Sequence, residues 1–453
     1  MSVTEVNSQQ TPSVKTGMFI NRNYGFLFTG QFISLIGDQI FDLTLILWIT
    51  LILAKGQAWA PLAVSGLLVV TSIPIFIIGP IAGIYVDRWN RRTTMLWMDI
   101  IRAILIASLL AISGIIPLPK SIAGFTTHNA AIWYIYLIVF LESSCSQFFS
   151  PARFALIGET VAAPQRAQAT GLAQLSQAIA AIAGPPIAAP LLIGFGVQWA
   201  LGVNAISFLL SFLAVSFVRY IPTKKIQPAN EGKSKEFMQG VRLIFGNTFL
   251  RAIAAASFFM MVGLGAFIAL IVFFITNNLH ASPTKLGVLM GVFGGGAVVG
   301  AIIFSIFMNR LGIERVYVWS IMFSGILLLG FSRLSNIYFA FIFVFIIGVL
   351  QSALNIATSP LVLRETPNAM LGRVSAILTP FGTLGTMAAT GLAGFLASTA
   401  LLHFHAQFVG MTFGPIDTII GGAGLIVILA GAVAGFSIRS RTAAKTPTAE
   451  QSA

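Results

Sequence analysis

Charged residues are scarce in this sequence. Only 9% of its 453 residues are charged and 57% are hydrophobic, whereas soluble domains have about 25% charged residues. A soluble chain with so little charge could not cover its own surface, so the excess apolar surface must face lipid. The sequence also has a single cysteine, Cys145, which excludes an intrachain disulfide.

Motifs of enzymes and ATP-driven pumps are absent as well. The sequence contains no HExxH motif and no Walker-type loop, so nothing in it indicates an ATP engine, a metal site or another cofactor. The four histidines lie outside the long apolar runs, and Cys145 therefore has no base at membrane depth. We predict that the protein is not an enzyme. The net charge of +13 comes from dispersed basic residues, which does not favour nucleic-acid binding.

Twelve apolar runs are long enough to cross a bilayer, which takes about 20 residues of helix. They lie near 24–54, 61–86, 94–116, 131–152, 167–194, 197–219, 249–279, 285–308, 315–333, 336–359, 371–400 and 415–438. The first run is too long for the core of a cleavable signal peptide and is expected to act as an uncleaved anchor. These runs predict an all-α membrane protein.

Lysine and arginine are distributed unevenly among the segments that join these runs. With the N-terminus inside the cell, 21 of them lie in cytoplasmic segments and four in outer segments, and Arg102 lies within the third run. Lysine and arginine accumulate in cytoplasmic loops. Both termini are therefore predicted to be cytoplasmic, in a multi-pass protein of the plasma membrane.

The longest basic segment divides the chain into two halves of six runs. It covers 220–248 and separates a first bundle, 24–219, from a second bundle, 249–438, with tails at 1–23 and 439–453. The segment has apolar residues at helical spacing, which are Phe237, Val241, Ile244 and Phe245. We expect a short amphipathic helix on the inner membrane surface, with a disordered linker as the alternative.

The two halves also share a short repeated pattern. Each has a Ser-Pro pair at the end of its fourth run, then a Glu-Thr pair, then an arginine. These are Ser150-Pro151, Glu159-Thr160 and Arg166 in the first half, and Ser359-Pro360, Glu365-Thr366 and Arg373 in the second. The same order at the same position indicates a duplicated six-helix unit, as in transporters with internal repeats.

The loop after the second run contains a glycine, an Asp-Arg pair and two further arginines. These residues are Gly83, Asp87, Arg88, Arg91 and Arg92. Their pattern and position resemble the signature loop of the major facilitator superfamily of secondary transporters. The resemblance implies two six-helix bundles that alternate between inward-open and outward-open states, with this loop as a cytoplasmic latch. Gly83 would allow close helix approach, and Asp87 would face an arginine or a helix N-terminus. The equivalent loop of the second half, with Ser305 and Asn309, is expected to be weaker.

Other segments resemble exporting branches of this superfamily. Gly184 and Pro185 in the fifth run match a Gly-Pro motif of exporting antiporters, although a generic kinked helix is the alternative. The first run, with its Gly37-Asp38 step, and Gly240 before the seventh run resemble the macrolide-efflux and siderophore-exporter branch. The superfamily's arginine motif on the fourth helix has no match, because the charge at that depth is Glu142.

Three acidic residues lie at bilayer depth, where an ionisable side chain is costly and usually functional. They are Asp38, Asp42 and Glu142. Because burial disfavours the charged form of a carboxyl group, they are candidates for carrying a coupling proton; hydrogen bonding between helices is the alternative. Asp99 and Arg102, three residues apart in the third run, are expected to form a structural ion pair.

Uncharged polar residues form stripes along several runs and are predicted to line the substrate cavity. The candidates are Gln31, Ser34, Ser146, Gln174, Gln351, Asn355, Thr383 and Thr386. They could instead serve only in contacts between helices. The predicted function is proton-coupled efflux of an amphipathic small molecule such as a drug, a macrolide-like compound or a siderophore, with membrane lipid, the substrate and protons as partners. Metabolite import and lipid flipping are the alternatives, ahead of a channel or an intramembrane enzyme.

Overall fold

The computed structural model describes residues 20–113, 128–219, 233–367, 370–408 and 411–445. Within these residues, twelve helices are long and apolar enough to span a membrane, which confirms the predicted number. The first half contains α1 (Arg22–Trp48), α2 (Ala60–Ile77), α3 (Gly79–Arg88), α4 (Arg91–Ser108), α5 (His128–Thr160), α6 (Arg166–Phe195) and α7 (Val197–Ser216). The second half contains α8 (Lys233–Gly246), α9 (Thr248–Asn277), α10 (Lys285–Leu311), α11 (Ile313–Phe331), α12 (Ile337–Glu365), α13 (Leu371–Ser398) and α14 (Pro415–Lys445).

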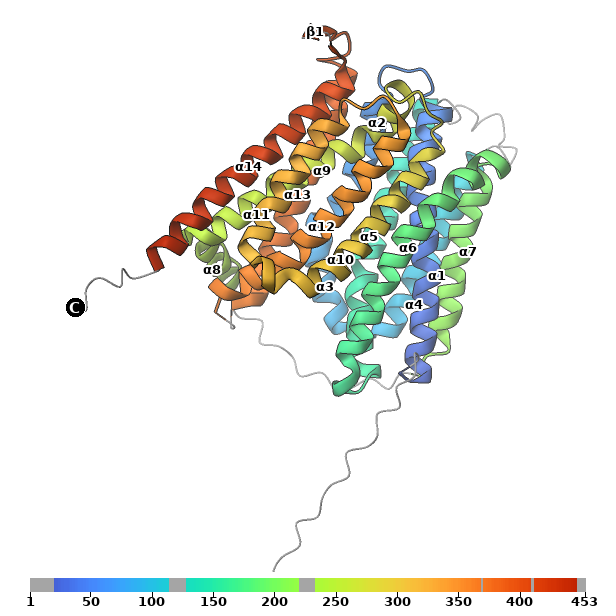
Figure 1. Ribbon diagram of the computed structural model, residues 1–453. Helices are drawn as coiled ribbons and strands as arrows, with labels where there is room; N and C mark the ends of the chain where they lie inside the picture. Colours follow the sequence, from blue (N-terminus) through green and yellow to red (C-terminus); the bar gives the residue numbers. More distant parts are fainter. Residues whose placement is uncertain (1–19, 114–127, 220–232, 368–369, 409–410, 446–453) are drawn as a thin grey trace, which may run out of the picture.

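The helices form two bundles that stand side by side (Figure 1). In the first bundle, α1 packs against α6 and α7, and α4 packs against α5 and α7. In the second, α9 packs against α13 and α14, α10 against α12, and α11 against α14. The second predicted run is divided into α2 and α3 at Ile78, because Pro74 and Pro80 each remove a backbone donor from the helical ladder.

The two ends of the bundles differ in charge. We call the end that carries Arg88, Arg91, Arg310 and Arg315 the basic end, and the opposite end the far end. Helix α1 begins at the basic end and α14 finishes there (Figure 1). A lipid-facing surface explains why large apolar side chains remain exposed along the helices, for example Trp133, Ile302 and Phe436.

Close contacts join the two bundles toward the far end. There α10 packs on α6, and Gly287, Gly291 and Gly294 face the stretch 182–186. A Cβ atom at Gly291 would lie 2.9 Å from Cγ of Pro186. Helices α2 and α13 make the second contact between the bundles, where Leu62 N donates a hydrogen bond of 3.0 Å to Ser398 Oγ.

Toward the basic end the two bundles diverge (Figure 1). Thr170 and Gln174 of α6 and Ser305 of α10 are exposed there, although the same two helices are in contact toward the far end. A Cβ atom at Gly171 would meet open space. The conformation is therefore closed at the far end and open at the basic end.

Helix α8 lies within the segment for which an amphipathic helix was predicted. It packs on α13 and α9: Gly240 faces the backbone of Arg373, and Gln239 Oε1 accepts a 2.7 Å hydrogen bond from the Arg373 guanidinium. Ile244 is buried and Phe245 is exposed, so one side of the helix faces protein. The side chain of Phe237 lies outside the described residues.

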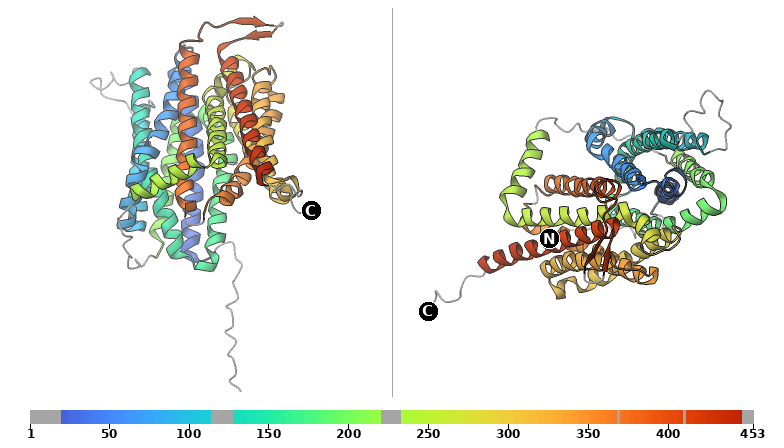
Figure 2. Two further views of the ribbon diagram at one scale, coloured as in Figure 1. Left: turned by 90° about the vertical axis from the view of Figure 1, so that its left-hand side faces the viewer. Right: turned by 90° about the horizontal axis from the view of Figure 1, so that it is seen from above.

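A small β-hairpin at the far end was not predicted from the sequence. Strands β1 (Ala406–Phe408) and β2 (Met411–Phe413) pair antiparallel between α13 and α14 (Figure 2). Arg333 stabilises the hairpin, because its guanidinium donates to Thr412 O at 3.3 Å, pairs with Asp417 at 2.8 Å and lies 4.2 Å from the centre of the Phe413 ring.

Candidate functional site

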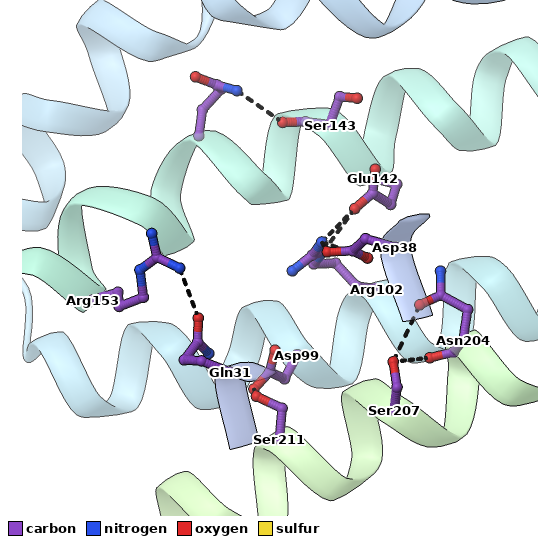
Figure 3. A network of polar contacts seen from close by, with 11 residues as sticks. Gln31, Asp38, Asp99, Arg102, Glu142, Ser143, Arg153, Asn204, Ser207 and Ser211 are labelled. Atoms are coloured by element: carbon purple, nitrogen blue, oxygen red, sulfur yellow. Dashed lines mark hydrogen bonds and ion pairs between the residues drawn. The ribbon is translucent and has the colours of Figure 1, made fainter. Parts of the chain in front are cut away.

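Arg102 of α4 lies at the centre of a buried charged network in the first bundle (Figure 3). Its Nε donates to Glu142 Oε1 of α5 at 2.8 Å, and its Nη2 lies 3.2 Å from Asp38 Oδ2 of α1. The arginine side chain is only 4% exposed, against 25% for Asp38 and 14% for Glu142. One guanidinium thus joins three helices, and water reaches the two carboxylates more easily than it reaches the cation.

Aromatic rings hold the guanidinium in place. Its central carbon lies 4.0 Å from the centre of the Phe208 ring of α7 and 5.6 Å from that of Phe149. A cation over an aromatic face is attracted by the ring quadrupole. The flat guanidinium can stack on Phe208 and still donate along its edge to both carboxylates.

Small residues bring the helices of the network close together. A Cβ atom at Gly37 of α1 would lie 2.7 Å from Asn204 Oδ1 of α7, and one at Gly30 would lie 3.3 Å from Ser211 Cα. Glycine at these two positions allows the backbones of α1 and α7 to approach, as in other membrane helix pairs. The Gly37-Asp38 step therefore places the carboxylate of Asp38 against α4.

The ion pair expected between Asp99 and Arg102 is wrong. Asp99 is fully buried and accepts a hydrogen bond of 2.7 Å from Ser211 Oγ of α7, whereas the ion pairs found for Arg102 are those with Asp38 and Glu142. Spacing along one helix makes Asp99 and Arg102 neighbours, but two carboxylates on other helices orient the guanidinium away from Asp99.

Asp42 lies one turn beyond Asp38, toward the far end of α1. It is deep within the bundle, and yet its side chain is exposed. No ion pair of Asp42 is found in the part of the chain that the structure describes. A deep but accessible carboxyl group lines an open space, which is the position that a proton carrier requires. Its role in coupling stays a prediction, as do those of Asp38 and Glu142.

Gln31 and Ser34, predicted to line the cavity, are buried between helices. Gln31 Oε1 accepts a hydrogen bond of 3.2 Å from Nη1 of Arg153, a buried arginine of α5 whose guanidinium lies 4.9 Å from the centre of the Phe154 ring. In this conformation Gln31 therefore supports a second buried cation nearer the basic end (Figure 3).

The remaining cavity candidates lie on four different helices. Gln174 of α6 and Asn355 of α12 are exposed, and Ser146 of α5 is half-buried. The Oε1 atom of Gln351 on α12 is buried without a hydrogen-bond partner in the described residues. On α13, Thr383 and Thr386 donate to carbonyl groups of their own helix, at 3.2 Å and 3.4 Å. Contact with a substrate stays a prediction for all of them.

The predicted latch loop is attached to its own bundle in this conformation. Arg91 forms an ion pair with Glu159 of α5, and Arg92 donates to the carbonyls of Val215 and Ser216 at the C-terminus of α7. A cation at a helix C-terminus is favoured by the helix dipole. Asp87 and Arg88 are exposed, and no ion pair or hydrogen bond of Asp87 is found among the described residues.

Gly83 does not make the close approach expected of it in this conformation, because a Cβ atom there would meet nothing within 4 Å. At Gly184 the helices do pack closely. A Cβ atom there would lie 2.5 Å from Gln39 Cβ and 3.4 Å from Ile36 O, both of α1. Pro185 lies inside α6, which continues from Arg166 to Phe195, and it faces Gly287 of the second bundle.

The two bundles differ in the charge that they hold at mid-depth. The ion pairs found in the described part of the second bundle lie near its ends, Arg333 with Asp417 at the far end and Arg364 with Glu314 at the basic end. The network around Arg102 belongs entirely to the first bundle. The central role of Arg102 was missed by reasoning from sequence. A lone cation within an apolar run, accompanied by acids on other runs, was the available signal.

Twelve membrane-spanning helices in two packed bundles, with a buried ion network in one of them, define a membrane transport protein. The chain belongs to the Major Facilitator Superfamily, whose sequence pattern matches residues 27–273 and 253–452. The resemblance seen in the latch loop is thereby confirmed at the level of the family.

Known proteins agree with this assignment. The chain is 24% identical to the uncharacterized MFS-type transporter YkuC of Bacillus subtilis (strain 168), over 87% of this chain and 90% of the relative. It is 24% identical to macrolide efflux protein A of Streptococcus pyogenes, over 60% and 65% of the two chains. A bacterial homologue of the iron transporter ferroportin, solved in its inward-facing state, has the same fold, with a TM-score of 0.68 at 15% identity over 92% and 98% of the two chains.

Proposed function

We propose that this transporter exports an amphipathic small molecule from the cytoplasm across the plasma membrane in exchange for protons. The observation that carries the proposal is the network in which one buried guanidinium faces Asp38 and Glu142. With Asp42 and Asp99 there are four carboxyl groups around one cation that is always charged. Uncompensated negative charge in a low-dielectric interior is costly, so the network favours the uptake of protons.

The accessible position of the carboxylates supports proton exchange. Asp38 and Glu142 are partly exposed and Asp42 is exposed, while the arginine is shielded by Phe208. A proton that binds to Asp38 or Glu142 removes one ion pair with Arg102 and releases α4 from that helix. A proton-dependent contact between helices α1, α4 and α5 is a two-state element that a transport cycle can use.

The open end of the molecule supports access from the cytoplasm. The conformation is open at the basic end, and basic loops face the cytoplasm in membrane proteins. Export is further supported by the match to macrolide efflux protein A and by the Gly184-Pro185 step, which packs α6 on α1 and on the second bundle. Substrate would then bind from the cytoplasmic side before the bundles reorient.

The composition of the second bundle supports an amphipathic substrate. Phe258 and Phe381 lie 4.8 Å apart between α9 and α13, Phe258 also contacts Phe259, and Met261 lies near Gly382. Aromatic and thioether side chains can contact apolar ligands of different shapes. The polar groups Gln351 and Asn355 of α12 would then orient the polar part of the substrate.

Transport in everted membrane vesicles tests the proposal. Vesicles that contain the protein should accumulate a macrolide such as erythromycin when the vesicle interior is acidified, and should lose the accumulation when the pH gradient is collapsed. Asp38→Asn, Asp42→Asn and Glu142→Gln should each reduce gradient-driven accumulation. Glu314→Gln, at an acid near the basic end of the second bundle, is the matched control and should retain accumulation.

Other results would replace the proposal. Accumulation that persists in all three acid variants would exclude proton coupling through the network. Uptake that occurs only in right-side-out vesicles would indicate an importer, and movement of a labelled phospholipid between leaflets without macrolide transport would indicate a lipid flippase. A growth screen of an efflux-deficient host against drugs and siderophores would then define the substrate class.

A further inference from the structure

We propose that Asp99 is a positioning residue that receives the guanidinium of Arg102 when Asp38 and Glu142 are protonated. The inference rests on the proposed proton coupling. It identifies a second anionic partner for Arg102 in a part of the bundle where water does not reach the guanidinium. Arg102 would then have two positions, one that faces α1 and α5, and one that faces Asp99 on its own helix.

The geometry leaves one oxygen of Asp99 available for this role. Asp99 Oδ2 accepts from Ser211 Oγ at 2.7 Å, while Oδ1 is buried and has no hydrogen-bond partner in the described residues. Asp99 and Arg102 are three residues apart on α4, a spacing at which side chains are neighbours. The guanidinium could therefore reach Asp99 by rotation of its own side chain, without movement of a helix.

The energetic argument comes from the burial of the cation. Arg102 cannot lose its proton, and at 4% exposure it cannot reach water by a small movement. Protonation of Asp38 and Glu142 would leave it without an anionic partner, and a buried charge deprived of its partner is strongly destabilising. Phe208 offsets part of this cost through its ring face, but a carboxylate within reach offsets far more.

The charged groups around this position favour Asp99 as the second partner. Helix α1 presents Asp38 and Asp42, and α5 presents Glu142 and, nearer the basic end, Arg153, which is bound to Gln31. The side chains that α7 presents, Asn204, Ser207 and Ser211, are neutral. Among the described carboxylates of the network, Asp99 is fully buried and away from the accessible side, so water reaches it less readily than it reaches Asp38 and Glu142. Burial by itself disfavours a charged carboxyl group, so Asp99 would carry its charge when the guanidinium of Arg102 lies beside it.

Removal of the Asp99 charge should make protonation of the network harder. A carboxylate attracts protons and the guanidinium to the sites around it, so the loss of its charge weakens the protonated state of the network. In Asp99→Asn the midpoint of any proton-driven change should therefore move toward acidic pH by about one unit. The asparagine oxygen still accepts from Ser211, so a purely structural role predicts an unchanged midpoint.

The test measures the opening of the basic end as a function of pH, which requires no substrate. Spin labels on cysteines at Thr170 of α6 and Ser305 of α10, both exposed, would be introduced into a Cys145→Ser background. Double electron–electron resonance then reports the fraction of molecules that are open at the basic end between pH 5 and 9. Asp99→Asn should shift the midpoint to lower pH by about one unit; Ser211→Ala, which keeps the charge, should shift it by less than half as much.

The outcomes separate the inference from the proposed function. If the wild type shows no pH dependence, proton coupling is wrong and the inference falls with it. If Asp38→Asn and Glu142→Gln abolish the pH dependence but Asp99→Asn titrates like the wild type, the network couples protons and the role of Asp99 is wrong. A midpoint shift in Asp99→Asn with the distances of both states unchanged supports the exchange of partners by Arg102.

Discussion

Arg102 binds two carboxylates from two other helices through one guanidinium, and this geometry determines what can replace it. Nε and Nη2 both lie within 2.8 Å of Glu142 Oε1, Nη2 also donates to Asp38, and the central carbon lies over the Phe208 ring. An ammonium group is a compact point charge without a planar fork. The site is therefore specific for arginine rather than for positive charge.

We predict that Arg102→Gln abolishes gradient-driven transport and lowers stability by about 3 kcal/mol, because two carboxylates that are only partly exposed lose their partner. Arg102→Lys should restore some stability but not transport, since the ammonium cannot hold both acids and stack on Phe208. Thermal unfolding of the purified protein, measured beside vesicle transport, checks both statements. Wild-type transport by Arg102→Lys would show that charge alone is sufficient.

The acids of this site could be found from the sequence, but their partner could not. Asp38, Asp42 and Glu142 interrupt apolar runs. The energetic cost of an ionisable residue in the membrane is enough to identify them as candidate functional residues. Arg102 was assigned to Asp99 because helical spacing is the one geometry that a sequence gives directly. The true partners lie 64 and 40 residues away on α1 and α5, and the packing of α1 on α7 depends on Gly37 and Gly30.

At the scale of elements, α6 and α10 form the contact that closes the far end. Gly287, Gly291 and Gly294 of α10 lie against Pro185, Pro186 and Ile182, so any side chain on that face must displace atoms of α6. Helix α10 also carries Gly295, where an added Cβ atom would meet nothing within 4 Å. The same helix therefore provides a test position and its control.

Gly291→Leu should prevent closure of the far end, because the leucine would overlap Pro186 and Ile182. Overpacking of this kind costs about 1–3 kcal/mol, which would shift the population away from the state described here. Gly295→Leu adds the same side chain at an open position and should leave the population unchanged. Distances between spin labels at Thr170 and Ser305 measure the population; equal behaviour of the two variants would contradict this role of α10.

The sequence predicted the helices of this contact but not the contact. Gly184 and Pro185 drew attention to α6 through a motif, and close packing on α1 is found at Gly184. The glycines of α10 had no such motif, and their meaning depends on which helix of the other bundle lies opposite. The hairpin at 406–413 was also missed, because strands of three residues give too short an alternation to recognise.

At the scale of the whole molecule, the latch loop and the open basic end are consistent with each other. Asp87 is exposed where the bundles have separated, and its neighbours Arg91 and Arg92 bind the first bundle. An acid that bridges the bundles in the opposite state would have no partner in this one. Asp87 should therefore stabilise the state that is closed at the basic end and contribute little to the stability of the open state.

We expect Asp87→Asn to leave the state open at the basic end unchanged and to destabilise the opposite state. The loss of one charge-assisted hydrogen bond, about 1.5–3 kcal/mol, should favour basic-end opening and slow transport while expression stays normal. The spin-label distances give the population. Asn309→Asp in the second half should have little effect. Wild-type transport by Asp87→Asn would reduce the loop to a topology signal.

The orientation in the membrane follows from the charge of the loops and is tested directly. Reporter fusions after residues 23 and 445 should both be active only as cytoplasmic fusions, because both positions lie at or beyond the basic end. An external C-terminus would overturn the orientation. Hydropathy and loop charge were enough to predict twelve membrane-spanning helices and their division into two bundles. The lipid requires an apolar run in each helix separately, so this pattern can be read from the sequence without knowledge of the packing.

Among the described residues, ion pairs at mid-depth are confined to the first bundle, and this has a consequence for how such a protein can diversify. If the first bundle alone binds the coupling proton, the residues that line the cavity in the second bundle can change without loss of proton coupling. Substrate specificity and proton coupling could then evolve separately, because each would be encoded in a different half of the gene. A hybrid that joins residues 1–219 of this chain to the second bundle of a relative would retain its proton dependence and acquire the relative's cargo.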